Sequence, residues 1–320
     1  MYTTMILSFK FLTVNYFAKF YSKCQLFIMY FFKLNAILNT LDLTKERRNQ
    51  YMYKLVAIDM DGTLLDDSKT IPNENIRAIK EASNKGIKIA LATGRPLTGI
   101  KNYLNVLGLN SPDNFSIIYN GALIQNNTNK KIISQCLLNY DDLMYFHNLS
   151  RKFHIHMNVF TKDSCITSKL GKYTTLEAKW SNIDVKIVDF NNLDKNIEIT
   201  KVIFADEPEL ISKIMDNLDD DVYSKYAMAR SAPYFLEFFN KEINKGIAVK
   251  KYADSLNIHK EEIICIGDAG NDIEMIKFAG LGIAMENAFP EIKNVANYIT
   301  LSNENAGVAH AIDKFILSKF

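Results

Sequence analysis

The feature that most constrains this chain is an alternation of short apolar runs with segments of helical periodicity, which begins near residue 54. Leu55–Ile58, Ile87–Ala92 and Phe115–Tyr119 are apolar runs of strand length. Between them, apolar residues recur at helical spacing over 73–85 and 100–107, and a glycine ends each segment. Strands that alternate with helices through short connections form parallel sheets with right-handed crossovers. We therefore predict an α/β fold built on a parallel sheet.

The middle of the chain follows a different pattern, with several strands and fewer helices. Strands are predicted near 132–138, 154–160, 201–205, 223–229 and 234–239, and helices over 143–153 and 210–218. After residue 240 the alternation returns, with a helix over about 245–256 and strands near 263–266, 281–285 and 298–300. We predict an α/β core of residues 52–126 and 240–320, interrupted by an inserted α+β domain of residues 127–239.

Residues 1–51 differ in composition from the body of the chain. Residues 1–53 carry seven Lys or Arg and two acidic residues, a net charge of +5, whereas the remainder carries −3. Lysines interrupt the apolar residues, so no run is long enough for a membrane-spanning helix, and no signal-peptide pattern is present. We predict that residues 1–51 extend outside the fold. A packed helix and a peripheral contact with a membrane or a partner are the alternatives.

Composition excludes several classes of protein. The 320 residues are 48% hydrophobic and 23% charged, which excludes a chain that is mainly disordered. The net charge of +2 gives no reason to expect a nucleic-acid partner. The four cysteines lie far apart, without metal-ligand spacing and too few for a disulfide framework. A reducing cytoplasm is the simplest location.

The residues that follow the first strand carry the strongest chemical signal. Asp59 and Asp61 are separated by one residue and come before Gly62, which permits a tight turn. In parallel sheets the ligand site lies beyond the carboxyl ends of the strands. Two carboxylates there can divide the work of a nucleophile and of an acid that later acts as a base. The simpler interpretation is an acidic turn without chemistry.

Three further positions at strand ends or helix starts argue against that simpler interpretation. Thr93 and Arg95 follow the second strand, where a hydroxyl and adjacent backbone N–H groups can hold a phosphate. Asp268 and Asp272 follow the strand that ends at Ile266, and carboxylates suit Mg²⁺. Lys245 begins a helix, and there it can hold negative charge on a nucleophile and a phosphoryl group.

Together these motifs make the chain similar to the haloacid dehalogenase (HAD) superfamily of phosphotransferases, and within it to the Cof-like phosphatases. The resemblance covers about residues 52–320 and implies a Rossmann-like core with an inserted α/β cap domain. It rests on AIDMDGTLLD (57–66), LATGRP (91–96), YNGA (119–122), INKG (243–246), GDAGND (267–272) and GIAMENA (282–288).

The resemblance implies a role for each matching catalytic residue. Asp59 would be the nucleophile that forms an aspartyl-phosphate, and Asp61 would protonate the leaving oxygen and then activate water. Thr93 and Lys245 would bind the transferring phosphoryl group. This order of events is the one that phosphoryl transfer requires, with an in-line nucleophile and neutralised phosphate charge.

The resemblance also implies a metal and a substrate site. Mg²⁺ would be held by Asp59, the backbone carbonyl of Asp61 and Asp268, while Asp272 would orient Lys245 or a metal-bound water. The substrate would contact three further side chains, those of Arg95, Asn120 and Asn271.

We therefore predict a Mg²⁺-dependent hydrolase of small phosphomonoesters, with sugar phosphates as the favoured substrate class. Pyridoxal phosphate, flavin mononucleotide and nucleotides stay open. A phosphosugar mutase with the same intermediate and a non-catalytic protein that binds phosphorylated metabolites are the alternative functions.

Several weaker signals lie in the middle of the chain. His154 and His156 are predicted on one face of a strand, in surface or packing roles. Tyr173 and Trp180 fall in the least regular part, where they could line a specificity pocket, and Glu237 could meet the substrate. The run at 219–221 of three aspartates is interpreted as a solvated turn.

Overall fold

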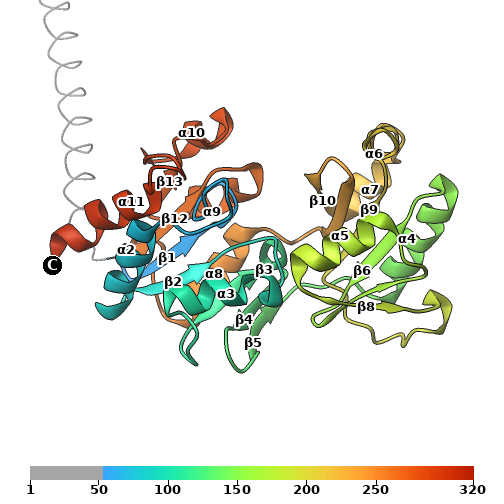
Figure 1. Cartoon of the computed structure of the whole chain (residues 1–320), viewed down its shortest axis with the longest axis horizontal. Coiled ribbons are helices and arrows are strands. Elements are labelled where there is room, and N and C mark those ends of the chain that lie inside the picture. Colours follow the sequence, from blue (N-terminus) through green and yellow to red (C-terminus); the bar gives the residue numbers. More distant parts are fainter. Residues whose placement is uncertain (1–52) are drawn as a thin grey trace, which may run out of the picture. The chain divides into compact units, whose positions relative to one another are not determined.

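The computed structural model describes residues 53–320, and Figure 1 shows their ribbon in colour. The prediction that residues 1–51 form an extension lies outside the described residues. Within residues 53–320, no helix is long and apolar enough to cross a membrane.

A five-stranded parallel sheet forms the core, and this confirms the predicted fold class. Its strand order is β14 (Tyr298–Ile299), β13 (Leu281–Ala284), β12 (Ile263–Gly267), β1 (Leu55–Ile58), β2 (Lys88–Leu91). Ile58 at the end of β1 is in register with Ile266 of β12 and Leu91 of β2. Residues that follow these three strands therefore emerge at one edge of the sheet.

Both faces of this sheet are covered, because side chains alternate along each strand. Val56 and Ile58 of β1 pack against α2, α3 and α11, whereas Leu55 and Ala57 pack against α8. Gly86 and Gly108 take left-handed backbone angles just after α2 and α3, as predicted. The helices of the core are α2 (Asn73–Asn84), α3 (Leu97–Leu107), α8 (Lys245–Ser255), α9 (Ile273–Phe278), α10 (Pro290–Val295) and α11 (Gly307–Phe315).

A small antiparallel sheet follows the core strands in the chain. It contains β3 (Phe115–Ile118), β4 (Leu123–Asn126) and β5 (Ile132–Gln135). A single parallel bridge between Ala92 and Ile117 joins β3 to the end of β2. Strand β5 was predicted within the inserted domain, yet its partner is β4. The domain boundaries themselves stay a prediction.

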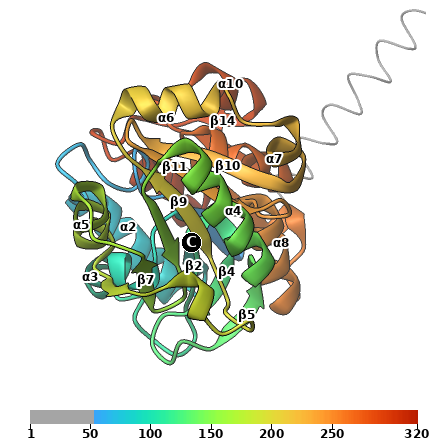
Figure 2. The ribbon, with the colours of Figure 1, turned by 90° about the vertical axis from the view of Figure 1, so that its right-hand side faces the viewer.

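A separate six-stranded sheet occupies the middle of the chain, and Figures 1 and 2 show its helices α4, α6 and α7. Its strands are antiparallel except for the parallel pair β7 and β8. We call this sheet and its helices the cap. Its strands, in spatial order, are β10 (Tyr226–Ala232), β11 (Phe235–Asn240), β9 (Lys201–Ala205), β6 (Met157–Phe160), β7 (Ser164–Thr167) and β8 (Asp184–Ile187).

Four helices belong to the cap, where the sequence predicted two. Helices α4 (Tyr140–Phe153), α6 (Pro208–Met215) and α7 (Asp220–Lys225) share a hydrophobic cluster with one face of the sheet. Helix α5 (Lys172–Ser181) contributes Tyr173 to a cluster with residues of the opposite face, such as Phe160 and Phe235. Periodicity hid α5 because its two buried aromatic and acidic side chains, Tyr173 and Glu177, do not form an apolar stripe.

Three local predictions in the cap were wrong. His154 ends α4 with a left-handed backbone, and β6 begins only at Met157, so the two histidines do not lie on a strand. The aspartate run at 219–221 begins helix α7 instead of forming a turn, because acidic residues stabilise a helix start. Tyr223, predicted in a strand, lies in the same helix.

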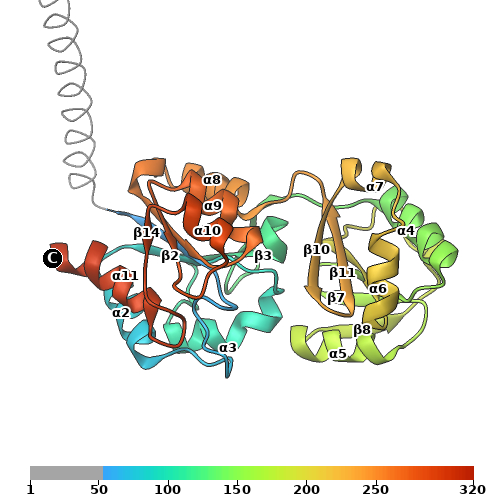
Figure 3. The same cartoon turned by 90° about the horizontal axis from the view of Figure 1, so that it is seen from above.

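Several hydrogen bonds join the cap to other parts of residues 53–320, and two of them come from α3 and from the turn after β3. The Thr98 hydroxyl at the start of α3 donates to the Ser181 carbonyl at the end of α5, at 2.9 Å. The Tyr119 hydroxyl donates to the Thr161 carbonyl in the cap, at 3.2 Å. Figure 3 shows α3 and α5 from above.

Candidate active site

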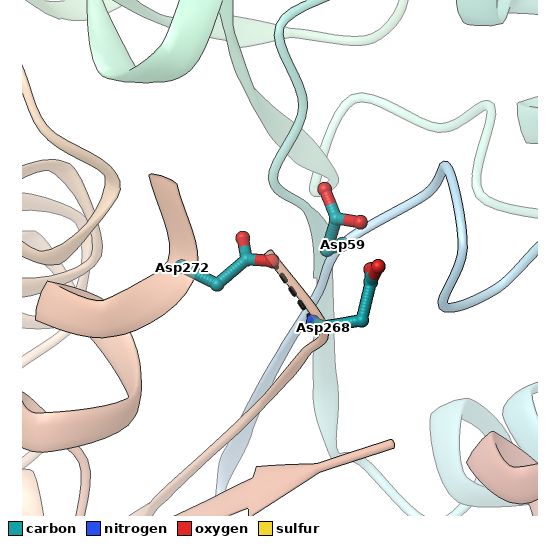
Figure 4. A group of neighbouring side chains, drawn as sticks. All are labelled: Asp59, Asp268 and Asp272. Atoms are coloured by element: carbon teal, nitrogen blue, oxygen red, sulfur yellow. Dashed lines mark hydrogen bonds between the residues drawn. The ribbon is translucent and has the colours of Figure 1, made fainter. Parts of the chain in front are cut away.

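Three buried aspartates meet where β1 and β12 end. Asp59 follows β1, while Asp268 and Asp272 follow β12. One carboxylate oxygen from each lies within 4.8 Å of the others, and Figure 4 shows the three side chains together. The register of the two strands brings residues more than 200 positions apart to one edge.

Lys245 joins two of these aspartates. Its side chain is fully buried, and its Nζ donates to Asp59 at 2.5 Å and to Asp272 at 2.7 Å. Lys245 is the first residue of α8, whose start is fixed by the Asn244 side chain accepting from the Ile247 N–H. The helix start thus carries a cation into the carboxylate cluster.

A tight turn brings the Asp59 segment against Asp268. Gly62 has a φ of +83°, and a Cβ there would lie 2.5 Å from a carboxylate oxygen of Asp268. The next residue, Thr63, donates its hydroxyl to the other oxygen of Asp268 at 2.7 Å. Only glycine combines this backbone angle with this close approach.

Asp272 holds the loop after β12 in place. One oxygen accepts from the backbone N–H groups of Asp268 and Ala269, at 3.0 and 3.1 Å, while the other accepts from Lys245. Figure 4 draws the first of these bonds. Asp272 therefore bonds both the Lys245 side chain and the backbone of Asp268.

The cluster carries more negative charge than Lys245 neutralises. Burial, with the nearby charge of Asp272, raises the pKa of Asp59 well above its ordinary value. Burial also raises the pKa of Asp268 to about 6. Burial alone would lower the pKa of Lys245, but Asp272 and Asp59 outweigh it and raise that pKa. The three carboxylates and one ammonium form a site with unbalanced negative charge.

Asp61 points to different partners from those of Asp59. Arg95 donates to both of its carboxylate oxygens, at 2.8 and 2.7 Å, and Lys69 donates to one of them at 2.9 Å. Burial would raise the pKa of Asp61, but Arg95 and Lys69 outweigh it and hold that pKa below its ordinary value. Asp61 is therefore held as a carboxylate.

The polar residues after β2 and β3 form a second part of the site. The carbonyl of Thr93 accepts from the Asn120 N–H at 2.9 Å, and the Thr93 hydroxyl accepts from the Arg95 N–H at 3.2 Å. The Asn120 side chain accepts from Asn271 at 3.0 Å. Tyr119, Asn120 and Gly121 all have positive φ, so the chain turns sharply here. This turn links the loops after β2, β3 and β12.

A family model described as haloacid dehalogenase-like hydrolase matches residues 56–312. The chain belongs to this family.

Individual relatives of this haloacid dehalogenase-like hydrolase are phosphatases by name. "Putative phosphatase YxeH" of Bacillus subtilis is 42% identical over 270 residues, which cover 84% of this chain and 100% of that protein. "5-amino-6-(5-phospho-D-ribitylamino)uracil phosphatase YcsE" of the same organism is 32% identical, covering 85% of this chain and 99% of that protein. The hydrolase is accordingly a phosphatase of the Cof type.

A solved structure supports the same family. A haloacid dehalogenase-like hydrolase from Bacteroides thetaiotaomicron superposes with a TM-score of 0.74 at 32% identity, covering 82% of this chain and 99% of that one.

The hydrolase brings its predicted site residues into contact in two groups. The first group is Asp59, Lys245, Asp268 and Asp272. The second group, linked by hydrogen bonds, is Asp61, Thr93, Arg95, Asn120 and Asn271. Arg95, predicted to face the substrate, pairs with Asp61 here. Its contact with substrate stays a prediction, as do the roles of the other residues.

Two further residues contact the site and were not singled out from the sequence. Thr63 bonds Asp268, and Lys69 bonds Asp61. Thr63 lies inside the motif after β1, so its position was a usable signal. Lys69 lies in the following loop, where no local pattern distinguishes it from a surface lysine.

The three clustered aspartates can hold a metal ion. Their oxygen donors suit a hard divalent cation, and their burial together leaves charge that such a cation would neutralise. The donor set therefore fits the metal that the sequence predicts.

Proposed function

We propose that the chain is a Mg²⁺-dependent phosphatase that hydrolyses small phosphomonoesters through an aspartyl-phosphate on Asp59. The observation that carries this proposal is the buried Lys245 between Asp59 and Asp272, with Asp268 beside them at the ends of parallel strands. Such a site can place a nucleophile, a fixed cation and metal ligands around one phosphoryl group.

In the first step, an Asp59 oxygen attacks phosphorus and the ester oxygen leaves. Lys245 stabilises charge on the Asp59 side, and Thr93 with its neighbouring backbone N–H groups binds the phosphoryl oxygens. The leaving oxygen takes a proton from Asp61. Arg95 and Lys69 hold Asp61 as a carboxylate in this structure. When substrate binds, Asp61 therefore leaves these partners and takes up a proton from solvent, which it then gives to the leaving oxygen.

In the second step, water attacks the phosphorus of the aspartyl-phosphate and gives up a proton to Asp61. Inorganic phosphate leaves and Asp59 is restored. Asp59, the Asp61 backbone carbonyl and Asp268 would hold Mg²⁺, while Asp272 would orient Lys245 or a metal-bound water. When bound, Mg²⁺ would supply positive charge opposite the phosphoryl oxygens.

Sugar phosphates are the substrate class we propose. The name of the relative YcsE describes a phosphate carried on a ribityl group, which is a sugar-alcohol chain. We place the reaction in the cytoplasm, in keeping with the free thiols of Cys136, Cys165 and Cys265. A nucleic-acid partner is not part of the proposal.

The test is phosphate release from a panel of sugar phosphates, pyridoxal phosphate, flavin mononucleotide and nucleotides, with Mg²⁺ and with chelator. Metal-dependent release concentrated on sugar phosphates supports the proposal. Release from every class alike would contradict the substrate class. An isomerised sugar phosphate without free phosphate would instead identify a mutase.

A further inference from the structure

A cavity is lined entirely by cap residues. Its volume is about 610 Å³, which is in the usual range of small-molecule sites. All its lining residues fall between 147 and 207, and most lie at the end of α4, in the segment that joins β7 to α5, at the start of α5 and in the loop after β9. The aspartate cluster contributes none of them.

Two of the three cationic side chains that line this cavity have no ion-pair partner among residues 53–320. Arg151 and Lys169 both line it, and no carboxylate in residues 53–320 forms an ion pair with either. Lys172 also lines it and pairs with Glu207 at 3.1 Å, and Glu207 is further engaged by the Tyr173 hydroxyl at 2.7 Å. Arg151 and Lys169 are exposed and have no ion-pair partner among residues 53–320. Asp206 and Glu207 add two carboxylates to the same lining, so its three cations leave a net charge of +1.

Three of the five histidines of the chain surround the same space: His147, His154 and His156. The Nδ1 atom of His147 is buried and has no hydrogen-bond partner. Burial, and then Arg151, lowers the pKa of His147, while burial, and then Lys169, lowers that of His156. One of the three histidines therefore brings a buried polar atom without a hydrogen-bond partner to this space.

The start of α5 adds backbone hydrogen-bond donors to the lining of the cap cavity. Gly171 is its N-cap residue and provides no side-chain partner for the first N–H groups of the helix. Gly171, Lys172 and Tyr173 all line the cavity. Unpaired N–H groups at a helix start attract anions, and here they share a cavity with unpaired cations.

We propose that this cap cavity binds a small oxyanion of the phosphate class, either inorganic phosphate or the phosphate group of a metabolite. Arg151 and Lys169 supply the charge, and the histidines and the start of α5 supply hydrogen bonds. Leu170 and Phe190 add an apolar wall for a carbon skeleton.

The cavity is distinct from the candidate active site. Helix α5 has ten residues, so its ends lie about 15 Å apart at 1.5 Å per residue. The Ser181 end contacts the core through Thr98, whereas the Gly171 end faces the cavity. Binding here therefore does not depend on the proposed reaction.

The experiment follows the histidine ring signals of the whole chain by NMR, with carbon-13 in histidine and inorganic phosphate as the probe. The Asp59→Asn variant in chelator removes turnover. We expect saturable shifts for His147, His154 and His156, with a Kd of about 1 mM or less. His259 and His310 do not line the cavity and are the internal controls.

Paired variants make the test specific. Arg151→Gln with Lys169→Gln should weaken binding at least about 10-fold, since charge-assisted bonds to phosphate are lost. Lys179→Gln with Lys186→Gln makes the same change in net charge on exposed lysines outside the cavity and should leave binding unchanged. Neither pair should change basal turnover in an otherwise unchanged chain.

The same titration with a hexose 6-phosphate distinguishes a site for inorganic phosphate from a site for the phosphate group of a metabolite. Tighter binding of the sugar phosphate than of inorganic phosphate would identify a metabolite site, and the reverse order would identify a phosphate site. Absent shifts, equal shifts at all five histidines, equal effects of chloride at the same ionic strength, or unchanged binding in the Arg151 and Lys169 variant would each overturn the proposal.

Discussion

Two buried lysines invite comparison, one in the core and one in the cap. Lys245 is fully buried between Asp59 and Asp272, and Lys201 of β9 is 3% exposed between Glu237, at 3.0 Å, and Glu177, at 3.4 Å. Both pair one ammonium with two carboxylates from distant parts of the chain. By composition alone, the two clusters would be equally good candidates for a site.

The groups that surround Lys201 and Lys245 differ. In the cap, hydroxyl groups of Ser181 and Ser231 donate to the two glutamates, and the Phe160 ring lies 4.8 Å from the Lys201 ammonium. In the core, a third carboxylate, Asp268, joins the cluster, and within residues 53–320 no second cation forms an ion pair with it. With all carboxyl groups ionised, the cap cluster would keep one net negative charge, to which serine hydroxyls donate, whereas the core cluster would keep two. A buried cluster of charged side chains is a candidate ligand site when much of its charge stays unbalanced at the carboxyl ends of parallel strands.

The largest expected effect is on turnover when the core cluster loses its nucleophile. Asp59→Asn should lower kcat by at least about 10⁴-fold, because the covalent step is lost. Circular dichroism and thermal unfolding should show a folded protein. Turnover within 10-fold of the unchanged enzyme, measured as phosphate release, would remove Asp59 as the nucleophile.

The matching change in the cap should affect stability. Lys201→Met leaves Glu177 and Glu237 buried without a cation, so the free energy of unfolding should fall by about 3 kcal/mol. The kcat of the folded enzyme should stay close to that of the unchanged chain. Urea unfolding measures the first quantity and phosphate release the second.

A surface lysine is the control for this variant. Lys162 pairs with Glu198 in a partly exposed position, so Lys162→Met should cost less than about 1 kcal/mol. A stable Lys201→Met variant without turnover would break the comparison, since the cap cluster would then belong to the site.

Both pH and Mg²⁺ should change how much the core cluster contributes to the stability of the fold. The pKa of Asp268 is about 6 in the folded chain against 3.8 ordinarily, so the folded state keeps a proton that the unfolded state releases. In chelator, this carboxyl therefore stabilises the fold below about pH 4, and its contribution is lost as pH rises through 6. Mg²⁺ should remove that loss by favouring the carboxylate.

The measurement is the melting temperature between pH 4 and pH 7, with chelator and with Mg²⁺. The Asp268→Asn variant should lose both the pH-dependent part and the metal effect. The Asp254→Asn variant changes an exposed carboxylate paired with Lys250 and should keep both. The same metal effect in both variants would argue against Asp268 as a ligand.

The smallest expected effect concerns residues 1–51. All proposed site residues and the whole family match lie between 56 and 312. Deleting residues 1–51 should therefore leave kcat and KM within about two-fold, the range of changes remote from a site. A large fall in turnover would show that this segment contributes to the site or the fold.

Local pattern was enough to predict the α/β fold class and the edge of the sheet where the candidate site residues gather. Apolar runs ending in Asp59, Thr93 and Asp268 identified strands and the edge where they end, because parallel strands align their carboxyl ends. The residues that begin the core helices, and the glycines that follow them, could also be predicted from the sequence. The cap was harder, since α5 buries polar Glu177 and Thr174 and so lacks helical apolar spacing.

What the sequence determined by itself is the α/β core and the edge at which its chemistry gathers, because both follow from short-range periodicity and strand direction. Only the tertiary structure decided how charges pair: Arg95 with Asp61, Lys201 with Glu177 and Glu237, and the unpaired cations of the cap cavity. These pairings join residues 24 to 36 positions apart, for which no local pattern exists. Packing of distant segments fixes them, and burial then sets their strength.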